Sequence, residues 1–296
     1  MADTSGGVGH LGGIGLGTAP LGGLYDAVDD DTALAVVDRA WELGIRYFDT
    51  APYYGSGLAE RRLGEALRGR PRDELVVSTK VGRLLRPDVS GWRGAYFDFS
   101  HDAALRSLDE SLSRLGLDRV DIVLVHDPDD HYDEALTGAF AALRRLREEG
   151  VVRAIGVGMN QAELLCRFAR EADPDCFLVA GRYTVLDRTA EAELLPLCEE
   201  RGIAVIAGGV FNSGILAGGD TFDYQTAPPD VVARVRALGE VCARWEVPLP
   251  AAAVQFPGRH PAVRSTLVGC RSVAELEEDV RLFGLELPVG LWQELA

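Results

Sequence analysis

The run "VDIVLVH", residues 120–126, decides the fold class because its apolar residues follow one another without alternation. Strands that are buried on both faces of a parallel sheet have this pattern. Seven more short β-type runs occur, at 13–18, 45–50, 75–80, 152–158, 176–181, 203–208 and 264–269. Helical patterns are found at 32–43, 58–68, 101–115, 133–149, 161–171, 190–201, 230–244 and 272–282. Eight strand–helix pairs predict an α/β fold, a (β/α)8 TIM barrel.

Local signals and chain length support this prediction. Ser100 precedes the helical stretch at 101–115 and Gly116 follows it, while Asp31 and Gly44 flank the stretch at 32–43. Short polar residues cap helix N-termini, and glycine ends helices in the left-handed conformation. The 296 residues suit one barrel of about 250 residues with extended loops. No change in composition marks a boundary, so we expect one domain over residues 1–296.

Composition excludes several classes of protein. The net charge of −16 and the absence of a Lys/Arg block argue against nucleic-acid binding. No window holds the roughly 18 uninterrupted apolar residues of a membrane span, and "MADTSGGVGHLGG" lacks the basic start and apolar core of a signal peptide. The five cysteines form no C-x-x-C pair, and their odd number predicts reduced thiols and a cytoplasmic location. The sequence indicates no oligomeric state.

One lysine stands among 30 basic residues, at position 80, where it ends the run "LVVSTK". Arginine is always charged, whereas lysine is compact and can shift its pKa. Reactive residues of a barrel lie at the C-terminal ends of its strands. Asp49 and His126 end the neighbouring runs. We therefore expect the three ionisable side chains to converge.

Two tyrosines follow Asp49 in the segment "DTAPYYG". An ammonium close to a phenol favours the phenolate and lowers its pKa, and a carboxylate would hold that ammonium in place. Asp49, Lys80 and either Tyr53 or Tyr54 can form this chain, and His126 could orient a substrate oxygen or share the proton. The residues therefore predict an acid/base for a carbinol oxygen and leave the choice of tyrosine open.

Other motifs are weak. "GVGHLG" at 7–12 follows no strand and opens no helix, so it does not predict a dinucleotide site. The acidic run "HDPDDHYDE" at 126–134 lacks EF-hand and H-E-x-x-H spacing. We expect it to start a helix near residue 132 and to bind no metal.

Several of these segments resemble the aldo-keto reductase family. The resemblance is carried by "FDTAPYYGSGLAERRLGEAL" (48–67), "VVSTKVGRLLRP" (76–87), "DIVLVHDPDD" (121–130), "AIGVGMNQ" (154–161), "GRYTVLDR" (181–188) and "AAAVQFPGRHPAV" (251–263). It implies a (β/α)8 barrel, a nicotinamide cofactor and hydride transfer. It also implies a catalytic set of Asp49, Tyr54, Lys80 and His126, with Tyr54 rather than Tyr53 as the acid/base.

Four segments are most similar to the aldose 1-dehydrogenase branch, which includes D-threo-aldose, L-fucose and L-galactose dehydrogenases. They are "GLGTAPLGGLY" (15–25), "GVGMNQ" (156–161), "LVAGRYTVLD" (178–187) and "GGVFNSGILAG" (208–218). This branch oxidises the anomeric carbon of an aldose to the lactone, which implies a small sugar substrate and a tyrosinate base whose pKa Lys80 lowers. Pyridoxal 4-dehydrogenase is a close relative.

The resemblance also implies a set of cofactor contacts. They fall on Gly17, Thr18, Asn160, Phe211, Asn212, Ser213, Gly214, Gly269, Arg271, Ser272, Glu275 and Asp279. The chain departs from the usual pattern: Met159 replaces a Ser, Ala180 a Gln, and Gly208 the Tyr that stacks on nicotinamide. Phe211 could stack instead. Glu275 stands where an Arg often binds a 2′-phosphate, so we expect NAD rather than NADP, although Arg271 could reach a phosphate.

Loop positions give the candidate substrate contacts Tyr25, Tyr53, Trp92, Asp127 and Arg182. Aromatic faces and a carboxylate suit a polyol. Three alternatives stay open at this point. Lys80 could be the nucleophile of a Schiff-base aldolase, which the Tyr54–His126 pair argues against. The chain could be a general aldehyde or ketone reductase, or a cofactor-sensing subunit without turnover.

Overall fold

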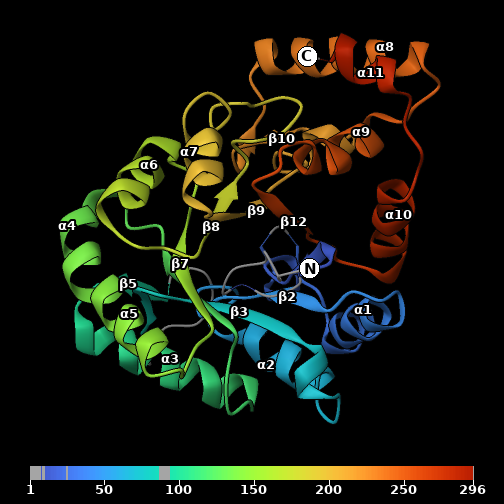
Figure 1. Ribbon diagram of the computed structural model, residues 1–296. Coiled ribbons are helices and arrows are strands. Elements are labelled where there is room, and N and C mark those ends of the chain that lie inside the picture. Colours follow the sequence, from blue (N-terminus) through green and yellow to red (C-terminus); the bar gives the residue numbers. More distant parts are fainter. Residues whose placement is uncertain (1–7, 9–10, 25, 87–93, 296) are drawn as a thin grey trace, which may run out of the picture.

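The computed structural model describes residues 8, 11–24, 26–86 and 94–295. Within this part of the chain, parallel strands close into a barrel in the order β1-β12-β9-β8-β7-β6-β3-β2 (Figure 1). The barrel strands are β1 (Gly13–Gly17), β2 (Tyr47–Asp49), β3 (Val76–Val81), β6 (Ile122–His126), β7 (Ala154–Met159), β8 (Cys176–Ala180), β9 (Ala204–Gly208) and β12 (Val263–Val268). Each overlaps one predicted run, so the predicted barrel is confirmed.

Helices lie around the outside of the barrel (Figure 1). They are α1 (Asp30–Glu42), α2 (Leu58–Ala66), α3 (His101–Leu115), α4 (Tyr132–Glu134), α5 (Phe140–Glu148), α6 (Ala162–Glu171), α7 (Leu194–Arg201), α8 (Pro229–Arg244), α9 (Leu249–Gln255), α10 (Val273–Phe283) and α11 (Val289–Glu294). Ser100 caps α3, and Gly116 ends it with a φ of 63°, as predicted. The predicted cap of α1 was wrong, because Asp29 rather than Asp31 accepts from the Thr32 N–H, at 2.7 Å.

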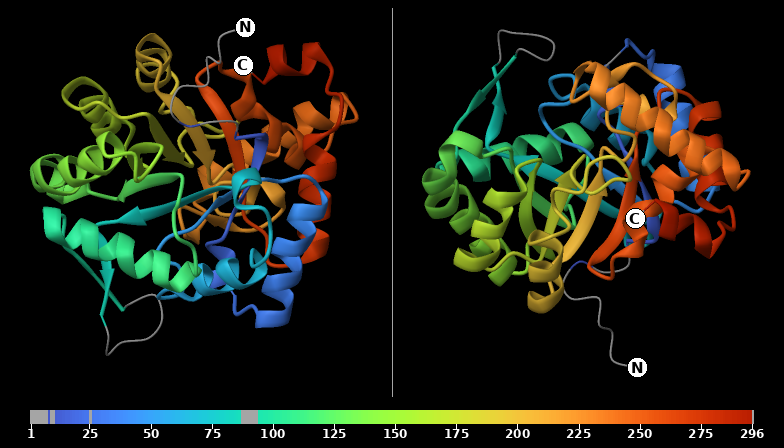
Figure 2. Two further views of the ribbon diagram at one scale, coloured as in Figure 1. Left: turned by 60° about the horizontal axis from the view of Figure 1, so that its bottom comes forward. Right: turned by 90° about the horizontal axis from the view of Figure 1, so that it is seen from above.

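The structure contains elements that the sequence patterns did not predict. Between β9 and β12, α8 matches the predicted helix, but the short α9 packs against α10 at the barrel wall, and α8 lies outside beside α11 (Figure 1). The loop after β3 forms a hairpin of β4 (Arg83–Leu85) and β5 (Ala95–Phe97), which projects from the body of the molecule (Figure 2). A second hairpin, β10 (Thr221–Phe222) with β11 (Gln225–Thr226), follows β9.

Side-chain alternation along the strands explains how the barrel positions ionisable groups. Every second residue points into the lumen and joins one buried apolar cluster, whose members include Tyr47, Val76, Ile122, Leu124, Leu178 and Ile206. The intervening residues pack under the helices. Asp49, Lys80 and His126 are spaced by even numbers from lumen residues of their own strands, so they continue the same inward columns at the C-terminal rim.

Two further observations concern the described residues as a whole. All five cysteines are described, and each is a buried free thiol. None of the helices in this part of the chain combines the length and apolar character that a membrane crossing requires.

Candidate active site

Lys80 is the centre of a buried polar network at the C-terminal rim of the barrel. Its ammonium donates to Asp49 Oδ2 at 2.7 Å, to the Thr50 carbonyl at 2.9 Å and to the Tyr54 hydroxyl at 3.1 Å. The lysine is 1% exposed and Asp49 is 3% exposed. A buried ion pair is held only where such additional bonds satisfy both charges. The predicted chain from carboxylate through ammonium to phenol is therefore present in the geometry.

Two lumen residues beneath Lys80 orient the carboxylate. Ser78 Oγ donates to Asp49 Oδ1 at 2.6 Å, and the Tyr47 hydroxyl lies 3.0 Å from Ser78 Oγ. Burial, reinforced by the Asp49 charge, raises the pKa of Tyr47 well above its ordinary value, so this phenol stays protonated. Tyr47 and Ser78 thus fix the Asp49 oxygen that does not bind Lys80. Sequence reasoning missed both residues, although each is an even number of positions from Asp49 or Lys80 on the same strand, which places it on the lumen side.

A close approach of two glycines places Tyr54. A Cβ at Gly22 would lie 2.7 Å from the Tyr54 carbonyl carbon, and one at Gly55 would lie 2.4 Å from the Gly22 oxygen. Gly55 also has a φ of 62°, which favours glycine. The loop after β2 therefore packs tightly on the loop after β1. It presents the Tyr54 ring edge-on to His126, with centroids 5.9 Å apart and planes at 88°.

Burial controls the protonation states of the network. It raises the pKa of Tyr54, and the Lys80 charge opposes this rise without cancelling it, so the pKa lies above its ordinary value rather than below it as we expected. Burial lowers the pKa of His126 well below its ordinary value, with Lys80 and Arg83 adding to the effect, so the imidazole is neutral near pH 7. Burial alone would lower the pKa of Lys80, but Asp49 and Tyr54 reverse this and keep the ammonium charged.

A second charged cluster adjoins His126. Arg83 Nη1 donates to Asp127 Oδ2 at 2.5 Å, and the same carboxylate oxygen lies 3.5 Å from His126 Nε2. The Arg83 guanidinium lies over the Tyr53 ring, 3.7 Å from its centroid. Tyr53 and Asp127, both predicted as substrate contacts, therefore lie at one site. Sequence reasoning missed Arg83, because its partner is 44 positions away.

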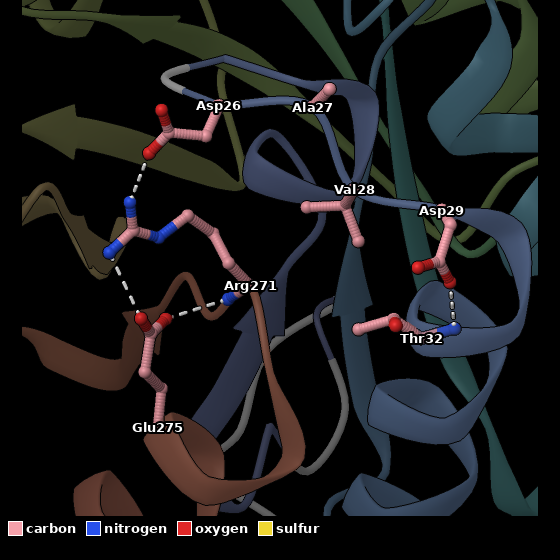
Figure 3. Close-up of a pocket in the computed structure, with 7 residues that line it drawn as sticks. All are labelled: Asp26, Ala27, Val28, Asp29, Thr32, Arg271 and Glu275. Atoms are coloured by element: carbon pink, nitrogen blue, oxygen red, sulfur yellow. Dashed lines mark hydrogen bonds and ion pairs between the residues drawn. The ribbon is translucent and has the colours of Figure 1, made fainter.

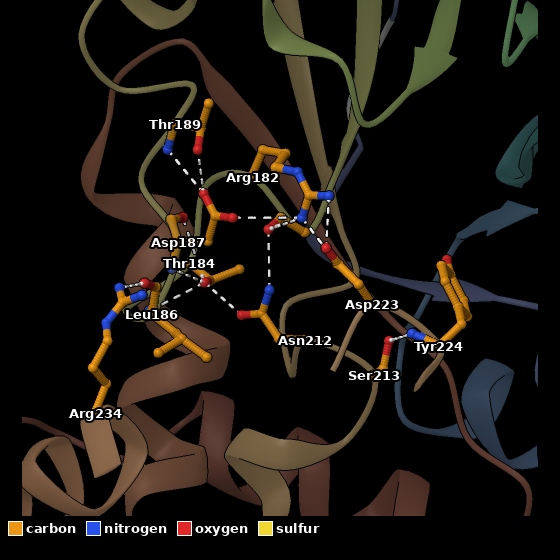
Figure 4. Close-up of polar contacts among 11 residues, drawn as sticks. Arg182, Thr184, Leu186, Asp187, Thr189, Asn212, Ser213, Asp223, Tyr224 and Arg234 are labelled. Carbon is orange, nitrogen blue, oxygen red and sulfur yellow. Dashed lines mark hydrogen bonds and ion pairs between the residues drawn. The ribbon is translucent and has the colours of Figure 1, made fainter. Parts of the chain in front are cut away.

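The loops after β8 and β9 are joined by polar contacts (Figure 4). Arg182 binds Asp223 through two bonds, of 3.0 and 2.9 Å, and lies 3.4 Å from Asp187. Ser213 Oγ accepts from the Tyr224 N–H at 3.1 Å. The predicted substrate contact Arg182 thus anchors the second hairpin. Its substrate role stays a prediction.

Within the predicted cofactor loop, Asn212 is 2% exposed. Its side chain accepts from Thr184 at 2.6 Å and donates to the Gly181 carbonyl at 3.0 Å. Phe211 is only partly buried, beside the core, and Gly214 has a φ of 101°. The Asn212 side chain therefore braces the loop, and the role of this segment in cofactor binding stays a prediction.

The N-terminus of α10 borders a shallow pocket of about 280 Å³, between the loop after β1 and the start of α1 (Figure 3). Arg271 crosses it, with Nη1 2.5 Å from Asp26 and Nη2 3.0 Å from Glu275. Ser272 caps the helix by accepting from the Glu275 N–H at 3.2 Å. Arg271 is therefore already bound by two carboxylates.

Asp279 lies one turn of α10 beyond Glu275 and accepts from the Cys270 thiol at 3.3 Å. Burial raises the pKa of Asp279 to about 7, and the nearby Glu275 charge adds to the effect. This side chain is therefore only partly charged near neutral pH, so it adds less than a full negative charge to the α10 region.

The remaining predicted contacts lie along the rim. Gly17 pairs with Asp49 in the barrel, and Thr18 is fully buried with its hydroxyl donating to the Asp49 carbonyl at 3.0 Å. Asn160 follows β7, and a Cβ at Gly269 would approach Pro20 to 3.0 Å. The predicted contacts Tyr25 and Trp92, and half of the motif at 7–12, lie outside the described residues.

The acidic run at 126–134 forms a 3-10 turn and starts α4 at Tyr132, as predicted. Among the described residues, no group of three or more His, Cys, Asp or Glu side chains could hold a metal ion.

Comparison with known proteins identifies the family. The profile of the Aldo/keto reductase family matches residues 13–295. The chain belongs to this family. As an aldo-keto reductase it is an NAD(P)-dependent oxidoreductase, and its barrel, with Asp49, Tyr54, Lys80 and His126 gathered at the C-terminal rim, agrees with the resemblance seen in the sequence.

Among curated relatives, the aldo-keto reductase is 45% identical to D-threo-aldose 1-dehydrogenase of Pseudomonas sp, over 96% of this chain and 92% of that one. It is 43% identical to pyridoxal 4-dehydrogenase of Microbacterium luteolum, over 95% and 92% of the two chains. It is 33% identical to L-galactose dehydrogenase of Arabidopsis thaliana, over 95% and 87%. A solved aldo-keto reductase from Bacillus halodurans, in its holo form, superposes with a TM-score of 0.78 at 26% identity, covering 96% of this chain and 91% of the other.

Proposed function

We propose that this enzyme oxidises the anomeric carbon of an aldose, of the L-fucose, L-galactose or D-arabinose type, to the lactone. The observation that carries the proposal is the chain from Asp49 through Lys80 to the Tyr54 hydroxyl, with distances of 2.7 and 3.1 Å. Similarity to a D-threo-aldose and an L-galactose dehydrogenase supports the substrate class.

In this mechanism Tyr54 is the acid/base. For oxidation, the tyrosinate accepts the proton of the anomeric hydroxyl while the hydride leaves the same carbon, and Lys80 stabilises the tyrosinate beforehand. When bound, the nicotinamide cofactor supplies the hydride acceptor. The neutral His126 can donate one hydrogen bond to the substrate oxygen, which orients that oxygen toward Tyr54. In reduction the same tyrosine, protonated, acts as the acid.

The residues at the rim fit a dinucleotide. The N-terminus of α10, capped by Ser272, offers N–H donors and a positive dipole end to a phosphate group. The Asn160 amide can bind a carboxamide, and the loop containing Phe211 and Ser213 lies at the same end of the barrel. These residues would hold the cofactor.

We propose a preference for NAD over NADP. Arg271 is neutralised by Asp26 and Glu275, so a 2′-phosphate would meet two carboxylates and one cation. We expect NADH to bind more tightly than NADPH in a fluorescence titration, and Asp26→Asn with Glu275→Gln to reduce the difference. Tighter binding of NADPH by the wild type would refute the proposal.

Substrate oxidation is tested by following NAD reduction at mildly alkaline pH. The panel is L-fucose, L-galactose, D-arabinose, D-glucose and pyridoxal, with NADP in parallel. Turnover of the first three sugars supports the aldose assignment. A protein that binds NADH but oxidises none of the sugars would lose that assignment.

Pyridoxal 4-dehydrogenase activity is the second candidate, favoured by the 43% identity to such an enzyme, and turnover of pyridoxal alone would establish it. A general aldehyde or ketone reductase would show turnover mainly in the reverse direction. A Schiff-base aldolase needs a neutral lysine, whereas Asp49 and Tyr54 raise the pKa of Lys80 against the effect of burial.

The five free thiols support a cytoplasmic location for the proposed reaction.

A further inference from the structure

The Arg83–Asp127 pair is a charged group that the proton chain does not use. Both side chains are partly buried, with 19% of Arg83 and 33% of Asp127 exposed. Desolvation offsets much of the attraction in a partly buried ion pair, so this pair is expected to add little to the stability of the fold. The pair adjoins the reacting centre, since the Asp127 carboxylate lies 3.5 Å from His126 Nε2.

The backbone holds Asp127 in an unfavourable conformation. Its φ is 44°, in the left-handed region that non-glycine residues rarely occupy and that is enriched at functional sites. Its N–H donates to the Gly158 carbonyl of β7 at 3.0 Å, which extends the ladder between the two strands one residue beyond the end of β6. This turn directs the carboxylate back over the rim, toward His126 and Arg83.

The β4–β5 hairpin supplies and fixes Arg83. The residue begins β4 and pairs with Phe97 of β5. Its guanidinium lies 3.7 Å from the Tyr53 ring centroid and 5.3 Å from that of Phe97. A cation held over aromatic faces loses little freedom when a ligand binds, so the donors are arranged in advance.

We propose that Arg83 and Asp127 together bind the hydroxyl groups on C2 and C3, the two carbons that follow the reacting anomeric carbon along the sugar. A guanidinium donates only, and a carboxylate accepts only. A vicinal diol presents oxygens that accept and hydrogens that donate, so it complements a pair containing one group of each kind. Tyr53 packs against the C–H face of the same sugar. The inference rests on the proposed aldose oxidation and assigns the selection of polyhydroxylated substrates to this pair.

The test compares a sugar with its 2-deoxy analogue. For whichever of L-fucose, L-galactose or D-arabinose the wild type oxidises, kcat/KM is measured for both compounds. Hydrogen bonds to charged groups predict a preference of about 10- to 100-fold for the hydroxylated sugar. Arg83→Gln and Asp127→Asn should each reduce this ratio at least about 10-fold, mainly through KM, on the same grounds. Arg106→Gln, which removes an exposed ion pair with Asp98 at 3.8 Å, is the matched control and should keep the wild-type ratio.

The outcomes separate the inference from the proposed function. If the wild type oxidises a sugar but both variants keep its ratio, the pair does not bind the hydroxyls, and the proposed function stands. If the wild type binds NADH and oxidises none of the sugars, both fail. Variants are compared only when their NADH affinity and thermal midpoint match the wild type, and having two variants protects the test against one that misfolds.

Discussion

Replacement of Lys80 by Met tests whether the ammonium controls Tyr54. The substitution keeps an unbranched side chain that is one atom shorter and removes the donor 3.1 Å from the Tyr54 hydroxyl. A hydrogen bond to a charged group contributes about 1.5–3 kcal/mol, which equals roughly 1–2 pKa units. The pKa of Tyr54, already raised by burial, should therefore increase further by about this amount.

The assay is the pH profile of kcat/KM for sugar oxidation. Oxidation needs the tyrosinate, so the wild-type rate should rise with pH toward the elevated pKa of Tyr54. The Lys80→Met profile should move to higher pH, with about 10- to 100-fold less activity at a fixed alkaline pH. Asp49→Asn is the comparison variant: the Asp49 charge raises the pKa of Tyr54, so its removal should move the profile to lower pH as long as Lys80 remains an ammonium.

Stability must be measured in parallel. Without the ammonium, Asp49 is a buried charge with no cation beside it, which costs about 3–5 kcal/mol of folding free energy. A folded Lys80→Met protein whose profile is unshifted would refute the coupling between Lys80 and Tyr54. Lys80→Arg keeps the charge, but its planar guanidinium cannot take the compact geometry of the ammonium, so we expect lost rate with the fold retained. Wild-type activity in Lys80→Arg would show that any cation at position 80 can support the reaction, whatever its geometry.

Three other predictions follow from the structure. Arg114 Nε binds the fully buried Glu60 at 2.5 Å. Arg114→Met leaves the Glu60 carboxylate without its cation, so urea unfolding should show a free energy of unfolding that is lower by about 3–5 kcal/mol. A loss of less than about 1 kcal/mol would contradict this reasoning. Gly156→Ala would place a Cβ 1.8 Å from a β8 carbonyl oxygen and should destabilise by about 3 kcal/mol, whereas Gly158→Ala, with its nearest contact at 3.5 Å, should unfold near the wild-type temperature. Because burial lowers the pKa of His126, the rate profile should show no histidine inflection between about pH 6 and 9, and an inflection that His126→Gln removes would contradict this.

The barrel was predictable because most of its strands are buried on both faces, which leaves largely apolar runs in the sequence. Helix boundaries were less predictable than the strands. For example, α7 begins at Leu194 and not near residue 190, because the preceding residues form turns around Asp187 and Thr189. The short α9 has few residues over which a helical period can be read. The hairpins have strands of two or three residues and are stabilised by distant partners, as Asp223 is by Arg182.

The candidate catalytic set was visible because Asp49, Lys80 and His126 lie at or next to strand ends in sequence order. Tyr54 lies in the loop after β2, and only the family resemblance distinguished it from Tyr53. The Arg83–Asp127 pair could not be predicted from the sequence, because it depends on a hairpin and on a left-handed turn that no local pattern specifies. The direction of the Tyr54 pKa shift was also inaccessible, because it is a balance between depth of burial and the Lys80 charge.

Because Lys80 is the only lysine in the sequence, chemical labelling of lysine side chains reports on this one buried position. Acylating reagents react with neutral, accessible amines. The Lys80 side chain is 2% exposed and is held as an ammonium by Asp49. Lysine acylation must therefore await an opening of the barrel rim that separates this pair. The rate at which mass spectrometry detects acylated Lys80 would measure how often this part of the rim opens, with no other lysine side chain to mask the signal.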